Sequence, residues 1–320
     1  MSLEIFLLLL LIVSIFTGLF TEGIKKLMDE VSSAVSLGLV EDLDIDAEGG
    51  KPVVQRNESK IIRTEFWRLD CTKLLADIKM RVKIGVSRDH GIPHYVVRYV
   101  NFSAQFTLDG GITLHQGIRE LTTCCLPERK LPKLSKYLVP VLSYDEMEIM
   151  VLQLLRKYRG EQAVLTFQEN GATALAQAMG LEIRRVSLYR NHHTAAILYL
   201  REGHVRVVAS GASGSATDDE PFQDMTIPAK TIVLNENRLR QGDIEREIYH
   251  ECGHYEWHSM FFELQALHAA DLRLLEYAEA DKASKPAEKD IKWVERQASF
   301  VGIAAMFPRP IITPLVNRYW

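Results

Sequence analysis

The segment from Asp243 to His258 constrains the fold of this chain more than any other stretch of its sequence. Asp243 follows a turn through Gly242 and is a favourable N-cap, so a helix is expected to begin there. His250 and His254 form the two ends of an HExxH motif and lie one turn apart on the same face of that helix. Two imidazoles in this arrangement can bind one small cation. The segment therefore predicts a helix that carries a metal site.

The residues between the two histidines indicate what such a site would do. Glu251 projects to the side of the histidine pair, where its carboxylate can take a proton from a water molecule at the open position of a zinc ion. Gly253 costs about 1 kcal/mol relative to alanine inside a helix, so it predicts that another element approaches closely. Cys252 points roughly 100° away from its neighbours, which favours packing over metal binding.

A catalytic zinc ion needs a third protein ligand, and His258 is the nearest candidate in the sequence. On a straight helix it lies about 12 Å along the axis from His250, which is too far for one metal ion to bind both. The glycine turn of the longer HExxHxxGxxH motif is also absent. His258 is therefore expected beside the metal, either supporting its ligands or lining a substrate cleft.

Glu295 is the better candidate for the third ligand. It lies in a second predicted helix, which Asp290 can cap and Pro308 ends. Glu295 shares one stripe of this helix with small or apolar residues, namely Ile291, Ala298, Gly302 and Ala305. Its carboxylate is therefore expected to point at the core, where it is costly unless it is paired or bound to a metal ion. A buried salt bridge with Arg246 is the alternative interpretation.

Composition favours a globular protein of a reducing compartment that does not bind nucleic acid directly. A chain of 320 residues, 47% of them hydrophobic, can bury one large core or two modest ones. The formal net charge of −4 provides no basic field that would neutralise phosphates. The four cysteines form no disulfide framework and stand at positions 71, 124, 125 and 252.

The first 21 residues are expected to form a hydrophobic leader or membrane anchor, because residues 5–20 are almost entirely apolar and could contact a membrane. An anchor followed by Lys25 and Lys26 would keep the rest of the chain on the cytoplasmic side. A cleaved signal is the second interpretation, although no positive charge precedes the apolar run and no clear cleavage site follows it. The third is a wrongly assigned start codon or a helix buried against the protein. Residues 22–59 are polar and are interpreted as a tether.

Two further regions follow the tether. Residues 60–143 are predicted to be rich in β-strands, to which no chemistry can be assigned. Residues 144–320 are predicted to form one α+β metallopeptidase domain, in which a small sheet packs on the HExxH helix in a zincin-like manner. The elements expected ahead of that helix are the helices Tyr144–Arg159 and Ala172–Met179 and the strands Ile183–Tyr189, Ala195–Leu200, His204–Ala209 and Thr231–Leu234.

The region from Thr173 to Pro308 resembles the ImmA/IrrE family of metallopeptidases. The matching features are the run ALAQAMGLEI from residue 174, the strand Ile232–Asn235 ahead of the zinc helix, the HExxH motif, and the run ERQASF from Glu295 in a helix that ends in Met-Phe-Pro. The resemblance implies that His250, His254 and Glu295 bind one catalytic zinc ion and that Glu251 is the general base. It also implies a cytoplasmic protein of a mobile element or stress response that acts on a helix-turn-helix repressor.

The expected mechanism is hydrolysis of a peptide bond in a protein or peptide substrate. A substrate strand is expected beside the strand Ile232–Leu234, with Glu251 moving the proton from water to the leaving amine. Tyr255, His258 and Arg296 are candidates for stabilising the oxyanion or contacting the substrate. A zinc-dependent regulator that binds a repressor without cleaving it is the alternative, although a binder has no need of Glu251. An extracytoplasmic peptidase released by a signal sequence is a third hypothesis.

Overall fold

The computed structural model describes residues 29–31, 33–34, 53–54, 59–86, 94–108, 112–135, 137–189, 194–208, 222–268 and 288–319. The chain divides into two compact units, Met1–Val141 and Leu142–Trp320, so the second unit begins two residues before the domain start expected at residue 144. The expected leader at residues 1–21 and most of the tether at residues 22–59 lie outside the described residues.

The first unit is built around a six-stranded sheet in which neighbouring strands pair antiparallel. Its strand order is β5-β4-β3-β2-β6, and β1 also pairs with β3. The strand-rich character expected of residues 60–143 is present, and its longest strand runs continuously from His94 to Leu108. The strands are β1 (Val53–Val54), β2 (Lys60–Arg68), β3 (Lys73–Val86), β4 (His94–Leu108), β5 (Ile112–Thr122) and β6 (Lys133–Leu134).

One arginine links three neighbouring strands of this sheet. Arg129 donates to both carboxylate oxygens of Asp77 on β3, at 2.9 and 3.0 Å, and to the hydroxyl of Ser103 on β4 at 2.6 Å. It also pairs with Glu120 on β5. These hydrogen bonds raise the pKa of the guanidinium and lower that of Glu120, so both groups stay charged. Each charged group in this half-buried cluster therefore has a partner of opposite charge. We interpret the cluster as a structural link between the strands.

The second unit is a mixture of helices and small sheets, so the α+β expectation is confirmed. Its central sheet has the order β7-β11-β8, with β11 parallel to β7 and antiparallel to β8, and a separate hairpin pairs β9 with β10. The strands are β7 (Glu182–Val186), β8 (Ala196–Tyr199), β9 (Gly203–Val208), β10 (Phe222–Ile227) and β11 (Thr231–Asn235). The helices are α3 (Tyr144–Arg159), α4 (Gln162–Leu165), α5 (Gly171–Ala178), α6 (Gln241–His268), α7 (Glu288–Met306) and α8 (Arg309–Tyr319).

The N-terminal helices of this unit are fixed by caps and by an apolar face. Ser143 and Glu146 form a capping box at the start of α3, and the helix buries the apolar stripe expected from its sequence. At the start of α5, the left-handed Asn170 provides no side-chain cap. A carboxylate oxygen of Glu245 on α6 accepts the hydrogen bond from the Ala172 amide instead, at 2.9 Å. This bond ties α5 to the helix that carries the HExxH motif.

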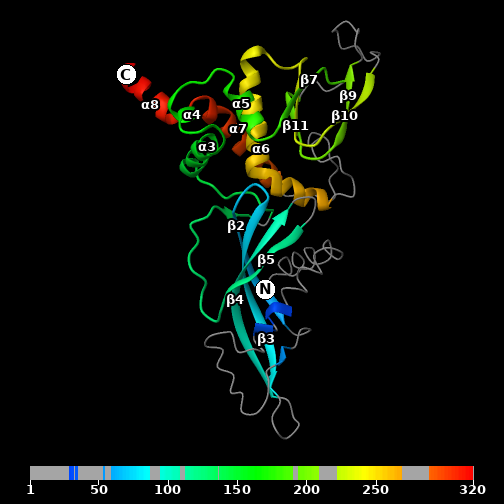
Figure 1. Ribbon diagram of the computed structural model, residues 1–320, viewed down its shortest axis with the longest axis vertical. Helices are drawn as coiled ribbons and strands as arrows, with labels where there is room; N and C mark the ends of the chain where they lie inside the picture. Colours follow the sequence, from blue (N-terminus) through cyan, green and yellow to red (C-terminus); the bar gives the residue numbers. More distant parts are fainter. Residues whose placement is uncertain are drawn as a thin grey trace. The chain divides into compact units, whose positions relative to one another are not determined.

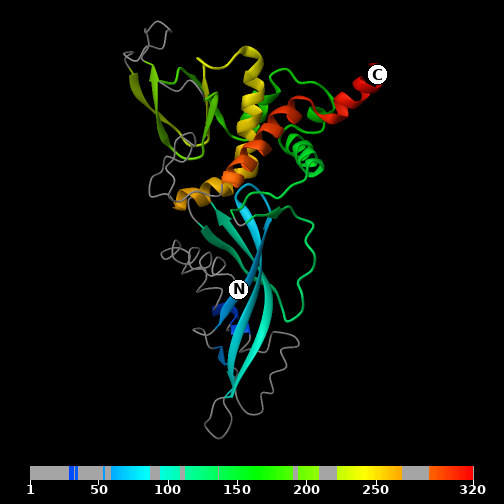
Figure 2. The ribbon, with the colours of Figure 1, turned by 180° about the vertical axis from the view of Figure 1, so that it is seen from behind.

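Helices α6 and α7 lie against each other in both views of the ribbon (Figures 1 and 2), and a glycine of each helix lies at their contact. A Cβ atom on Gly253 would lie 3.0 Å from the Val301 side chain, and one on Gly302 would lie 3.0 Å from the Arg246 carbonyl oxygen. The close approach that Gly253 predicted is therefore present. It brings the backbone of α7 directly against the turn of α6 that precedes His250.

Two helix starts differ from the sequence expectation. Helix α6 begins at Gln241, so Asp243 lies in its first turn rather than at the N-cap, where its negative charge still favours the helix dipole. Helix α7 begins at Glu288, two residues before the expected cap at Asp290. Local capping preferences place helix ends only to within a residue or two.

The described helices differ from membrane spans in length or in apolar composition when each is taken singly. None of them is by itself long and apolar enough to cross a bilayer. The helices Asp290–Met306 and Arg309–Arg318, which are bent by 59° relative to each other, reach the length and apolar composition of a membrane span only when they are taken together. The apolar residues 5–20 lie outside the described part of the chain.

Candidate metal centre

Three side chains from two helices converge on one point in the second unit. The Nε2 atoms of His250 and His254 on α6 lie 2.9 Å apart. The two carboxylate oxygens of Glu295 on α7 lie 3.5 Å from the His250 nitrogen and 3.6 Å from the His254 nitrogen. Within the described residues, this is the group of metal-binding side chains close enough to share one ion. The structure thus brings together the three ligands that the sequence suggested.

His250, His254 and Glu295 form a triangle, called the metal triangle below, that has the dimensions of a tetrahedral metal site. Ligand atoms around a tetrahedral zinc ion lie about 3.4 Å apart, given metal–ligand distances of about 2.1 Å. The separations of 2.9, 3.5 and 3.6 Å lie on both sides of that value. Two imidazoles and one carboxylate are also a common donor set for a catalytic metal ion with an open fourth position. The residues present therefore fit such an ion.

Glu295 differs in one respect from its expected position. Its side chain is 50% exposed, whereas that of His254 is 7% exposed, so the carboxylate closes the site from the solvent side rather than from the core. The alternative partner, Arg246, instead pairs with Glu247 and Asp243 on its own helix. The interpretation of Glu295 as a salt-bridge partner of Arg246 is therefore not supported by the contacts.

The charges of the triangle are strongly coupled. Partial burial raises the pKa of Glu295, but hydrogen bonds with His250 and His254 outweigh this effect and hold the pKa well below its usual range. Burial lowers the pKa of His250, but its hydrogen bond with Glu295 and the nearby charges of Glu251 and Glu247 raise it overall. Without a metal ion, the site therefore favours an ionised carboxylate and binds a proton on His250.

Glu251 lies beside the triangle and is almost completely buried, with 6% of its surface exposed. Burial raises the pKa of its carboxyl group, while the two neighbouring histidines lower it. No hydrogen bond or ion pair is found for this carboxylate among the residues that the structure describes. A carboxyl group with a raised pKa is suited to take up and release a proton near neutral pH. Cys252, next to it, is fully buried in the apolar core, as its direction on the helix predicted.

His258 lies one turn beyond His254 and is fully buried. Its Nδ1 atom lies 3.2 Å from Nδ1 of His254, and its Nε2 atom lies 2.8 Å from Oε1 of Gln297 on α7. Burial lowers the pKa of His258 well below its usual range, so the ring is neutral. The residue thus supports a ligand from inside the core, and both of its ring nitrogens already have partners.

Gln297 was missed by the sequence analysis, although one signal could have found it. It is the single polar residue on the buried stripe that also contains Val294 and Val301 of α7, and it is fully buried. An amide on an apolar stripe needs hydrogen-bond partners. The sequence by itself could not name the partner, because His258 belongs to another helix.

Two other candidates are not brought into contact with the triangle. The guanidinium of Arg296 lies over the rings of Tyr144 and Trp293, at 5.0 and 5.4 Å from their centroids. The Tyr255 ring packs against the apolar core, and its carbonyl oxygen accepts a hydrogen bond from the Ser259 hydroxyl. No contact of either side chain with His250, His254 or Glu295 is found in the described residues.

The expected position of a substrate strand is wrong. Strand β11 has β7 on one side and β8 on the other, and all five of its residues are buried. Its backbone groups therefore have no free edge to offer a substrate. In the described part of the sheet, β8 has one unpaired edge, and β8 also packs against α6. Sequence periodicity identified the strand but not its neighbours.

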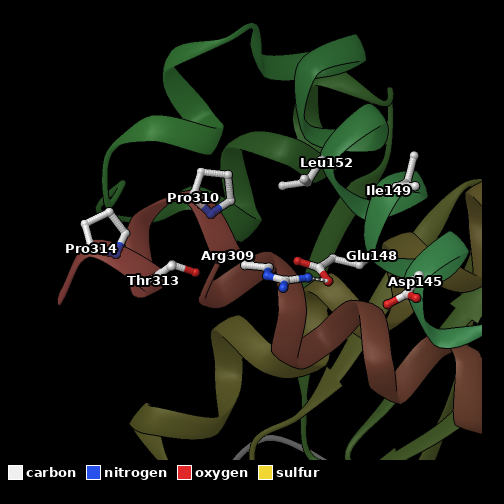
Figure 3. Close-up of a pocket in the computed structure, with 8 residues that line it drawn as sticks. All are labelled: Asp145, Glu148, Ile149, Leu152, Arg309, Pro310, Thr313 and Pro314. Carbon is white, nitrogen blue, oxygen red and sulfur yellow. Dashed lines mark hydrogen bonds and ion pairs between the residues drawn. The ribbon is translucent and has the colours of Figure 1, made fainter. Parts of the chain in front are cut away.

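Two of the cavities that the described residues line belong to the second unit. The smaller, of about 370 Å³, surrounds the first turns of α6 and is lined by Ala195, Arg238, Leu239, Arg240, Asp243, Arg246 and Glu247. Glu247 precedes His250 by three residues, so the cavity extends along the face of α6 that carries the metal ligands. The larger, of about 530 Å³, lies between α3 and α8, where Arg309 pairs with Glu148 at 3.0 Å (Figure 3). None of its lining residues belongs to the metal triangle.

Comparison with known proteins adds no assignment. No protein-family model matches the chain, and no curated protein or solved structure matches it either. The functional interpretation therefore depends on the residues and geometry of the site.

Proposed function

We propose that the second unit is a zinc-dependent endopeptidase with a zincin-like arrangement of the ImmA/IrrE type. One observation carries the proposal: the metal triangle is of the right size for one metal ion, and the buried carboxylate of Glu251 lies beside it on α6, the helix of the two histidines. His250, His254 and Glu295 would hold the zinc ion. A metal site that serves only structure has no use for a buried carboxylate next to an open position.

Each residue has a defined task in peptide hydrolysis. When bound, zinc supplies a Lewis acid that polarises a substrate carbonyl and makes a water molecule acidic near neutral pH. Glu251 accepts a proton from the attacking water while the water oxygen bonds to the carbonyl carbon. The carboxyl group then gives that proton to the amide nitrogen as the carbon–nitrogen bond breaks. The burial of Glu251 favours the first step, because a raised pKa makes the carboxylate a stronger base, and the greater basicity of the departing amine nitrogen drives the second.

Strand β8, which lies at one end of its sheet among the described residues, is the best-supported position for the substrate backbone. An extended peptide can add to an exposed sheet edge through main-chain hydrogen bonds. Strand β8 packs against α6, so a peptide at its edge would run across the helix that carries the metal ligands. The cavity at the start of α6 would then lie beside the same face and could receive a substrate side chain.

An extended segment of a protein is the substrate class that fits this arrangement. A helix-turn-helix repressor of a mobile element or stress regulon is the candidate that the family resemblance supplies. The same resemblance favours a cytoplasmic location for the catalytic unit. Neither proposal depends on residues 5–20 being a membrane anchor.

The decisive experiment compares the wild-type chain with Glu251→Gln and Glu295→Ala. Each zinc-loaded protein is incubated with a peptide library prepared from a digested proteome, and new peptide ends are identified by mass spectrometry. We expect new ends only with the wild type, about one zinc ion in both wild type and Glu251→Gln, and reduced zinc in Glu295→Ala. Glu148→Gln removes a partly exposed carboxylate on α3 outside the metal triangle, so it should bind zinc and cleave as the wild type does, while Glu251→Gln controls for contaminating proteases.

Each outcome separates two interpretations. New peptide ends in the Glu251→Gln sample at the wild-type rate would exclude Glu251 as the base. Zinc binding without cleavage by the wild type would favour the alternative, a zinc-dependent regulator that binds a repressor without cutting it. A folded wild type that binds no zinc would exclude both.

A further inference from the structure

A chain of three side chains leads from the metal triangle into the core of the second unit. It begins at His254, continues through His258 and ends at Gln297 on α7, with contacts of 3.2 and 2.8 Å. His258 and Gln297 are both fully buried, and His254 is 5% exposed. Water therefore has little access to these contacts, and the protons in them must be arranged among the three side chains.

The chemistry of the three groups allows one arrangement in which His254 can bind a metal. A neutral imidazole carries one proton, so one nitrogen donates and the other accepts. The amide oxygen of Gln297 only accepts, so Nε2 of His258 must carry the proton and its Nδ1 must accept. Nδ1 of His254 then donates, and its Nε2 retains the lone pair. That Nε2 atom is the one that faces His250 and Glu295.

Rotation of the amide by half a turn would reverse every step. Its nitrogen would donate to Nε2 of His258, Nδ1 of His258 would donate to His254, and the proton of His254 would move to Nε2. The metal-facing nitrogen would then have no lone pair. The orientation of one buried amide is thus linked to the ability of His254 to bind a cation.

We propose that Gln297, acting through His258, holds the proton of His254 on Nδ1 and thereby prepares Nε2 for the metal. Both are positioning residues, because the contacts described above link them to the metal triangle through His254. The proposal depends on the metal site of the proposed function but not on peptide hydrolysis. Partners of this kind orient metal-binding histidines in many proteins, and their loss typically weakens metal binding about 10- to 100-fold.

The first test measures zinc affinity of the full chain by competition with a chromogenic chelator. We expect Gln297→Met and His258→Phe each to weaken binding about 10- to 100-fold. His258→Asn, whose side-chain oxygen can accept at the position of Nδ1, should recover part of the loss. Ser259→Ala is the matched control, because it removes a buried hydrogen bond on the same turn of α6 that does not involve the histidines. It should bind zinc as the wild type does.

A double variant distinguishes a relay from two separate packing defects. Because Gln297 acts through His258, adding Gln297→Met to His258→Phe should cause no further loss of affinity. Losses that multiply in the double variant would overturn the proposal. Thermal unfolding of each metal-free variant shows which proteins are folded. If His258→Phe is unfolded, His258→Asn takes its place in the test.

The second measurement detects the proton itself. Nitrogen-15 spectra of histidine-labelled, metal-free protein distinguish a proton on Nδ1 from one on Nε2. His254 should carry it on Nδ1 in the wild type and should populate both forms in Gln297→Met. An Nε2 proton in the wild type, or unchanged zinc affinity in Gln297→Met, would overturn the inference. Failure of the wild type to bind zinc at all would instead overturn the proposed function.

Discussion

At the residue scale, the metal triangle combines a buried side and an open side. His254 is held from the core, whereas Glu295 reaches the same point with half of its side chain in solvent. The carboxylate is therefore the ligand that can adjust its position when a metal or substrate arrives. Glu251 lies on the buried side, where burial raises the pKa of its carboxyl group and where the proton transfer that we propose would be shielded from bulk water.

The coupled charges of the triangle predict a pH-dependent stability of the metal-free protein. The lowered pKa of Glu295 contributes stability above about pH 4.3, the ordinary glutamate value, which is lost as the pH falls. The raised pKa of His250 contributes stability below about pH 6.5, the ordinary histidine value, which is lost as the pH rises. The pair should therefore stabilise the protein most between these two values.

Urea unfolding in the presence of a chelator tests this prediction. The free energy of unfolding of the wild type should exceed that of Glu295→Gln by at most about 1 kcal/mol near pH 5.5, because the carboxylate is half-exposed. The difference should shrink by pH 8.5. A difference that grows towards alkaline pH would contradict the assigned pair. Zinc affinity should change in the opposite direction and rise with pH, because His250 must lose its proton to bind a metal ion.

At the element scale, the crossing of α6 and α7 determines whether the third ligand reaches the first two. The helices meet where the Val301 side chain packs on Gly253 and where Gly302 lies against the Arg246 backbone, and Glu295 lies two turns before Gly302 on α7. A Cβ atom at either glycine would push the helices apart. The glycines thus contribute to the metal site although neither of them contacts it.

Gly302→Ala tests this link between packing and metal binding. The new Cβ atom would lie 3.0 Å from the Arg246 carbonyl oxygen, a backbone atom that can move only with α6. We expect a loss of about 1–3 kcal/mol in the free energy of unfolding and weaker zinc binding. Ser299→Ala, at an exposed position of the same helix, should change stability by less than about 0.5 kcal/mol. Unchanged zinc affinity in Gly302→Ala would show that the crossing does not position Glu295.

At the scale of the whole molecule, the metal triangle belongs to one unit. The apolar cluster that surrounds α6 contains buried residues from Leu142 to Ala305, and none from the first unit. All ligands, the candidate base and the supporting Gln297 also lie in this unit. The first unit has its own sheet and its own buried ion network.

The second unit is therefore expected to fold and bind zinc by itself. A fragment of residues 142–320 should unfold in one cooperative transition on heating and should bind about one zinc ion with the affinity of the full chain. Calorimetry and chelator competition would measure the two properties. A fragment that is folded but binds zinc at least ten times more weakly would show that the first unit contributes to the site.

Local sequence patterns identified most elements of the second unit. Helix α3 followed from its apolar stripe, and β11 was expected as the strand Thr231–Leu234, because such patterns act over a few neighbouring residues. Strand β10 and helix α8 were missed. The first has a largely exposed pattern without clear alternation, and the second contains Pro314, which normally argues against a helix.

The sequence by itself determined that His250, Glu251 and His254 share one helix, since their spacing and the helical period are local properties. It also suggested Glu295, because a carboxylate among small residues is unusual. Only the tertiary structure decided that Glu295 reaches the histidines, that Gln297 contacts His258 and that β11 is central in its sheet. These facts depend on how segments far apart in the chain pack together, and that packing is governed by the burial and pairing of the whole unit rather than by neighbouring residues.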